Sequence, residues 1–207
     1  MLKFFKYFVL IISALFLVTV IVIYIGANYS GSRPLSEKEK NIAKSIYKNE
    51  IDLDKVKLVF DTVYCKDSTK VLGNTIHFNT NTWGLDIKEA DSADFDPLTY
   101  KYLLIHELGH VWQYQTKGWG YIPKSLIAQG VARIRTGSRS NAYNWEDRLF
   151  EGKKWEELNP EEQAESISDY FYYRELGDQA SSEQSDFIKK LECFIPFLVN
   201  SLCESEG

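Results

Sequence analysis

The sequence has no block of positive charge. Among its 207 residues, 24 Lys and Arg face 29 Asp and Glu, which gives a formal net charge of −5. The densest basic stretch has only three arginines, between Arg133 and Arg139. Proteins that bind nucleic acids need clustered Lys and Arg for their phosphate contacts. We therefore expect no nucleic-acid partner.

Cysteine and histidine are also scarce, with three residues of each. Cys65, Cys193 and Cys203 have no C-x2-C spacing, so cysteine predicts no metal site, and three cysteines cannot all pair within one chain. If the protein is exported, Cys193 with Cys203 is the first disulfide to test. Otherwise the cysteines are expected to be small buried apolar residues.

Apolar residues are plentiful, at 44% of the chain, and one long run of them stands out near the N-terminus. From Tyr7 to Ala27, 21 residues carry no charge, and Lys3 and Lys6 precede them. This length can span a bilayer, whereas the apolar region of a cleaved signal peptide, the alternative, is usually shorter. We expect residues 1–34 to be a membrane anchor or signal peptide with a linker. The basic N-terminus favours a single-pass protein of the cell membrane, embedded through residues 7–27, with residues 35–207 outside the cytoplasm, in the periplasm.

Local signals in residues 35–207 predict an α+β fold. Ser36 and Glu39 form a capping box that opens a helix ending near Asn49. Residues 56–60 and 76–78 are typical of short strands, with a turn at Gly73 and Asn74 between them, so we expect a short β-meander. Two clearly bounded helices follow: one begins at Asp96-Pro97 and ends at Lys117-Gly118, and the other begins at Asn159-Pro160 and ends at Gly177.

The first bounded helix contains the pattern H-E-x-x-H, as His106-Glu-Leu-Gly-His110. Histidines four residues apart project from one face of a helix, so both imidazoles can reach a single Zn²⁺. The intervening Glu107 would then lie beside the open position of the metal. This pattern predicts a zinc site with Glu107 as a general base.

A catalytic zinc site needs a third protein ligand, which we expect on the second bounded helix. Glu165 and Asp169 lie four residues apart there, on one helical face. We assign Glu165 as the ligand and Asp169 as the acceptor of the second ring N–H of a zinc histidine. Glu161 and Glu162, one turn earlier, remain alternatives. The predicted fold is thus a small domain with its zinc site between two helices.

These residues resemble known metallopeptidases. His106-Glu-Leu-Gly-His110 with Glu165-Ser-Ile-Ser-Asp169 is similar to the gluzincin arrangement of thermolysin-like peptidases, in which H-E-x-x-H is joined by a later E-x-x-S-D. Residues 106–115 and 161–171 also resemble small metallopeptidases associated with Vgr proteins and contractile injection systems. The resemblance implies zinc and a zincin-like peptidase domain over residues 35–207. His110 and Glu165 are much further apart here than in thermolysin, so no substrate pocket is carried over.

Two functional interpretations follow from this pattern. The first is a zinc-dependent hydrolase of metallopeptidase type, in which a metal-activated water loses its proton to Glu107 and attacks a peptide or protein substrate. The alternative is a non-catalytic zinc-binding protein of the cell envelope or of a secretion system. Glu107 discriminates between them, because a purely structural zinc site has no need of a carboxylate between its histidines. An effector domain of a secretion apparatus would share the first chemistry.

Overall fold

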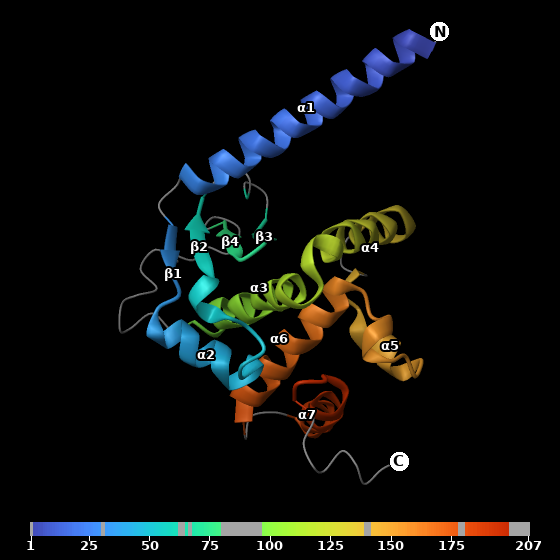
Figure 1. Ribbon diagram of the computed structural model, residues 1–207. Coiled ribbons are helices and arrows are strands. Elements are labelled where there is room, and N and C mark those ends of the chain that lie inside the picture. The colour runs from blue at the N-terminus through green and yellow to red at the C-terminus, as the bar shows by residue number, and fades with distance from the viewer. Residues whose placement is uncertain are drawn as a thin grey trace.

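A computed structural model describes residues 2–29, 32–61, 65, 68–79, 97–138, 142–177 and 181–198. Most of these residues form helices, and the remainder include one small sheet (Figure 1). The helices are α1 (Leu2–Tyr29), α2 (Glu37–Tyr47), α3 (Leu98–Lys117), α4 (Tyr121–Thr136), α5 (Trp145–Phe150), α6 (Pro160–Leu176) and α7 (Ser182–Phe194). Short 3-10 turns are η1 (Leu53–Lys55), η4 (Gly118–Gly120) and η6 (Trp155–Glu157). The strands are β1 (Ser32–Pro34), β2 (Lys57–Phe60), β3 (Lys70–Leu72) and β4 (Thr75–Phe78).

The sheet is not the expected meander. Its strand order is β1-β2-β4-β3, and β2 pairs with β4 in parallel, Leu58 opposite Ile76. The turn at Gly73 and Asn74 joins β3 to β4, which pair antiparallel. The sequence prediction missed β3, a strand of three residues, and therefore joined β2 directly to β4. Parallel neighbours cannot be connected by a tight turn, so the chain crosses over between them and β3 occupies the sheet edge.

The N-terminal prediction also needs correction. The apolar run lies within α1, which Figure 1 shows projecting away from the other elements. A bilayer crossing requires about 20 consecutive, predominantly apolar helical residues. Across the described residues, no helix combines that length with sufficient apolar character. By this finding, the predicted transmembrane helix, the membrane partner at residues 7–27 and the single-pass membrane localisation are wrong, and the fold is mostly helical with a small sheet.

The ends of the other helices agree well with their local sequence signals. The Ser36 side chain accepts a hydrogen bond from the backbone of Glu39, whose carboxylate caps Ser36 in return. Asn159 caps α6 through the backbone N–H groups of Glu161 and Glu162. Helix α3 ends at Lys117 as predicted. At its start Pro97, which was expected to be the first helical residue, is the N-cap instead, and Asp96, the expected N-cap, lies outside the described residues.

The core forms where α3 lies beside the sheet and crosses α6 (Figure 1). Leu104, Ile105 and Leu108 of α3 are fully buried in it together with Ile167 of α6. The Tyr47 hydroxyl of α2 donates to the Ile105 carbonyl at 2.6 Å. Because these contacts lie directly before residues 106–110 and within them, the core fixes the part of α3 that carries the histidine motif.

Two of the cysteines are described. Cys193 of α7 is disulfide-bonded, and its expected partner, Cys203, lies outside the described residues. Cys65 is fully buried, and its thiol donates to the carbonyl oxygen of Phe78 at 3.3 Å. Cys65 is therefore a small residue of the core, as expected for a cysteine outside a disulfide.

Candidate metal centre

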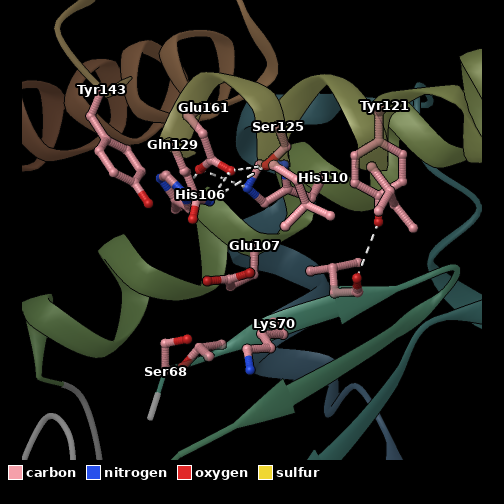
Figure 2. Close-up of a pocket in the computed structure, with 14 residues that line it drawn as sticks. Ser68, Lys70, His106, Glu107, His110, Tyr121, Ser125, Gln129, Tyr143 and Glu161 are labelled. Atoms are coloured by element: carbon pink, nitrogen blue, oxygen red, sulfur yellow. Dashed lines mark hydrogen bonds and ion pairs between the residues drawn. The ribbon is translucent and has the colours of Figure 1, made fainter. Parts of the chain in front are cut away.

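Two histidines of α3 face α6 from inside the protein. His106 and His110 are four residues apart, both are buried, and their ring centroids are 5.2 Å apart. Helical geometry places residues i and i+4 on the same face, and Figure 2 shows the two rings side by side. The expected pairing of the imidazoles is therefore present.

Glu161 of α6 completes a group of three potential ligands. Its Oε2 atom lies 3.3 Å from Nε2 of His110 and 3.7 Å from Nε2 of His106. All three ligand atoms lie within 4.8 Å of one another, and all three residues are buried. Two imidazole nitrogens and one carboxylate oxygen form a donor set that suits a divalent transition metal. This group can therefore hold a metal ion.

The remaining ring nitrogens are held by neighbouring acceptors. His106 donates from Nδ1 to Oε2 of Glu165 at 2.9 Å. His110 places its Nδ1 3.0 Å from Oε1 of Gln113, whose Nε2 donates to the Pro160 carbonyl at 2.8 Å. Because that amide presents its oxygen to the ring, Nδ1 of His110 carries the hydrogen. In both rings Nδ1 is thus engaged by an acceptor, and Nε2 is the nitrogen that remains for a metal ion on the Glu161 side.

Helix α4 holds the other side of Glu161. The Ser125 hydroxyl donates to Oε1 of Glu161, and Nε2 of Gln129 donates to the same oxygen at 2.7 Å. These two residues are four apart on α4 and so lie on one face of it. Their hydrogen bonds occupy Oε1 and leave Oε2 directed at the histidines.

The carboxylates expected on α6 are all near the site, but their contacts differ from the sequence assignment. Glu165 lies behind His106 and also accepts from the Tyr102 hydroxyl at 2.7 Å. Asp169 accepts from Tyr102 at 3.0 Å and from Nε1 of Trp145 at 2.7 Å. The histidine contact expected of Asp169 is therefore made by Glu165, and the three-residue group expected around Glu165 forms around Glu161.

Glu162, the other alternative, is engaged elsewhere. Its Oε2 accepts from the backbone N–H of Asn159 at 2.8 Å as part of the helix cap, and its Oε1 accepts from Nε of Arg148 at 3.2 Å. Both carboxylate oxygens are thus directed to the start of α6 and to α5. Glu162 stabilises the helix end on which Glu161 is presented.

Glu107 lies beside the histidines on the wall of a cavity of about 360 Å³. Figure 2 shows its carboxylate between the histidine pair and the strand that carries Lys70, with Ser68 nearby. Burial raises the pKa of Glu107, and the adjacent imidazoles oppose this shift. A carboxyl group with a raised pKa, next to a potential metal and facing a cavity, is placed to exchange protons with a bound molecule.

The electrostatics around the histidines favour a cation. Burial alone would lower the pKa of His106, but its contacts with Glu161 and Glu165 outweigh that effect and hold the pKa well above its usual value. His110 behaves alike: burial lowers its pKa, and Glu161 raises it above the usual value. Burial raises the pKa of Glu161, but the two imidazoles have the larger effect, so the net pKa lies below its usual value. A divalent ion would take the place of the protons that the carboxylates hold on the rings.

Several supporting residues were not predicted from the sequence. Ser125 and Gln129 hold Glu161, and Gln113 holds His110. Gln113 had a detectable signal, because it lies three residues after His110 on the same helix. Ser125 and Gln129 had none, since their role depends on where α4 docks.

Comparison with known proteins shows a weak similarity to a secretion-system protein. The chain is 27% identical over 161 residues to the type VI secretion system spike protein VgrG2b of Pseudomonas aeruginosa. The matched region is 76% of this chain but only 14% of that protein. No family model matches the chain, and the search of solved structures found no match. The likeness agrees with the predicted association with Vgr proteins, at the level of sequence similarity.

Proposed function

We propose that the chain is a zinc-dependent hydrolase of metallopeptidase type, with His106, His110 and Glu161 as metal ligands and Glu107 as the general base. The observation that carries the proposal is the buried group of three ligands beside a buried carboxyl group on a cavity wall. A structural zinc site is closed by four protein ligands, whereas a catalytic one keeps a position open. Three protein donors facing a cavity favour the catalytic type.

The ligand assignment follows from which oxygen each carboxylate leaves available. Oε2 of Glu161 faces both Nε2 atoms. Oε2 of Glu165 is hydrogen-bonded to Nδ1 of His106 instead, and its Oε1 to Tyr102. We therefore propose Glu165 as the residue that orients His106, with Asp169 and Tyr102 behind it.

The chain's own residues supply the proton transfers and positioning. When bound, zinc would polarise a substrate carbonyl and lower the pKa of water. Glu107 would accept the proton of the attacking water and then pass it to the leaving amine. Its raised pKa suits both steps, because a stronger base accepts the first proton more readily and burial keeps the carboxyl group away from bulk water. Ser125 and Gln129 would keep Glu161 aligned.

Metal analysis tests the metal site. The full-length protein, purified without added metal, should contain close to one zinc per chain, and a chelator should remove the zinc and lower the melting temperature. The variants H106A and H110A should contain little zinc. Metal-free wild-type protein obtained without a chelator would contradict the site itself.

The substitution Glu107→Gln tests catalysis separately from metal binding. Glutamine keeps the shape of the side chain but cannot take up the proton, so E107Q should keep its zinc and its fold and lose hydrolysis of unfolded polypeptide substrates. The control is zinc content measured on the same preparation. Wild-type rates in E107Q would remove Glu107 from the mechanism.

The comparison favours a second candidate function, a secretion-system-associated protein whose metal site is not catalytic. This candidate rests on the likeness to part of a spike protein. A metal-binding module of this kind would hold zinc and cleave no substrate, and E107Q would behave as the wild type does in every assay. The same pair of proteins therefore separates the two candidates.

A further inference from the structure

Helix α4 exposes an unusual amount of apolar surface. Outside α1, six large apolar side chains of the described residues are well exposed, and four of them lie on this helix. Ile134 is the most exposed of them, at 86%. Contiguous exposed apolar surface of this kind marks interaction sites. The six side chains are Leu126, Ile127, Val131 and Ile134 on α4, Trp119 on η4 and Phe150 on α5.

The exposed residues of α4 form one stripe along the helix. At 100° per residue, Leu126, Ile127, Val131 and Ile134 fall within about half of the helix circumference. Gly130 lies in the middle of the stripe, and a Cβ atom added there would meet nothing within 4 Å. A glycine inside a helix costs up to about 1 kcal/mol relative to alanine, and no neighbour within the described protein explains it. The stripe therefore faces open space.

The opposite side of α4 belongs to the candidate metal centre. Ser125 and Gln129 hydrogen-bond Glu161 there. Between these residues and the stripe, Ile122 and Leu126 line the cavity that contains Glu107. Leu126 is thus part of both the cavity wall and the exposed stripe. The apolar surface is continuous from the proposed active site to the outside of α4.

The margins of the stripe are basic. Helix α4 contains Lys124, Arg133 and Arg135 and no acidic residue, in a chain whose net charge is −5. Lys124 and Arg135 lie along one margin, and Arg133 lies along the other. Positive charge on both sides of an apolar stripe favours an occupant with apolar and acidic residues. A second copy of α4 is a less suitable occupant, because its basic margins would lie against the basic margins of the first copy and repel them.

We propose that the outer face of α4 binds an apolar segment of the polypeptide substrate, flanked by acidic residues, while a neighbouring segment lies in the cavity beside Glu107. This inference rests on the proposed hydrolase function. A cavity of about 360 Å³ accommodates only a few residues, so a longer chain would extend beyond it, and Leu126, which lines the cavity and is 63% exposed, leads from it to the stripe. The stripe would select unfolded or flexible polypeptides over short peptides.

Binding to an unfolded acidic protein tests the proposal. The probe is reduced, carboxymethylated α-lactalbumin, and the protein is the zinc-loaded full chain carrying E107Q, so that binding is measured without cleavage. Replacing Ile127 and Ile134 with Ser should raise the Kd for the probe at least ten-fold. Both side chains are exposed, so unchanged zinc content and circular dichroism should show that the fold is retained. Replacing Phe150 with Ser, at 67% exposure on α5, is the matched control and should leave the Kd unchanged.

The outcomes distinguish this inference from the function on which it rests. An unchanged Kd in the Ile127→Ser/Ile134→Ser variant, or equal losses in that variant and in Phe150→Ser, would overturn docking on α4. A wild-type dimer that the Ile127→Ser/Ile134→Ser substitutions dissociate would assign the stripe to a second copy and overturn it as well. If zinc-loaded wild-type protein binds the probe through α4 but cleaves no bond in it, the docking face stands and the hydrolase function fails.

Discussion

Three carboxylates of α6 lie one turn apart and make different contacts. Glu161 faces both Nε2 atoms, Glu165 contacts Nδ1 of His106, and Asp169 accepts from Tyr102 and Trp145. Glu161 thus faces the metal site directly, Glu165 reaches it through His106, and Asp169 is linked to Glu165 only through Tyr102. In such a chain, the effect of a substitution on metal affinity should decrease with distance from the metal.

Alanine substitutions of Glu161 and Glu165 should therefore lower zinc affinity by different amounts. E161A removes a ligand and should abolish stoichiometric zinc binding. E165A removes the acceptor of the His106 ring and should weaken zinc binding by about 10- to 100-fold. Chelator competition measures both. Glu162→Ala is the control, because Glu162 caps the helix and should change stability more than zinc affinity. A larger loss in E165A than in E161A would return the ligand role to Glu165.

At this scale the sequence predicts the motif but not the full donor set. His106, Glu107 and His110 follow from helical spacing alone, because all three are on one helix. Glu161, Glu165 and Asp169 share a face, so the spacing identifies the face and leaves open which turn meets the histidines. That choice depends on how far α6 is displaced along α3, which no local pattern encodes.

The crossing of α3 and α6 depends on a glycine inside the histidine motif. A Cβ atom on Gly109 would lie 3.1 Å from both Cα and Cβ of Ala164, and 3.4 Å from the Tyr47 hydroxyl. Two of these neighbours are fixed, because one is helix backbone and the other is hydrogen-bonded to Ile105. Gly109 therefore allows the helices to approach closely enough for Glu161 to reach both histidines.

Replacing Gly109 with Ala should destabilise the protein. Alanine gains up to about 1 kcal/mol in helix propensity, but overpacking a tight contact costs about 1–3 kcal/mol, and the neighbours here cannot move away cheaply. Gly130→Ala is the matched control, because open space surrounds that position, and it should stabilise the protein by up to about 1 kcal/mol. Urea unfolding of the two variants gives both values. A stabilised G109A would mean that α6 yields to the added methyl group.

Element boundaries were easier to predict than element neighbours. The cap at Ser36 was predicted because its partner Glu39 lies three positions on, and the cap at Asn159 because a proline follows it directly. The parallel pairing of β2 with β4 was not, because it depends on a chain crossover rather than on neighbouring residues. The β3 strand was missed because three residues carry almost no periodic signal.

The elements of the whole molecule are joined by a few buried polar contacts as well as by the apolar core. Arg33 of β1 forms two hydrogen bonds with the Glu39 carboxylate of α2, at 2.8 and 2.9 Å, and the Tyr100 hydroxyl of α3 donates to the same carboxylate. Burial raises the pKa of Glu39, but the hydrogen bonds from Arg33 and Tyr100 together have the larger effect, so the net pKa lies below its usual value. This cluster ties the sheet edge to the helix that carries the histidines.

His77 makes the stability of the whole molecule depend on pH. It lies in β4 between β2 and β3, is fully buried, and has its pKa lowered by burial, and by the nearby charge of Lys70, to about 4. The pKa of histidine in an unfolded chain is about 6.5. Between these two values the unfolded chain binds a proton that the folded protein does not, so the free energy of unfolding decreases as pH falls through this window.

His77 should lower the free energy of unfolding by about 3 kcal/mol at the low end of this window. Above about pH 6.5 it should have no effect, because histidine is then neutral in both the folded and the unfolded state. Urea unfolding of the metal-free protein at several pH values from 7 to 4.5 measures it. His77→Gln should show a shallower decline than the wild type, because all other titrating groups are common to the two proteins and cancel in the difference. The slope is the readout, since the substitution itself changes the absolute stability of a buried strand. Parallel curves for the two proteins would show that His77 titrates normally in the folded state and that its burial is not maintained in solution.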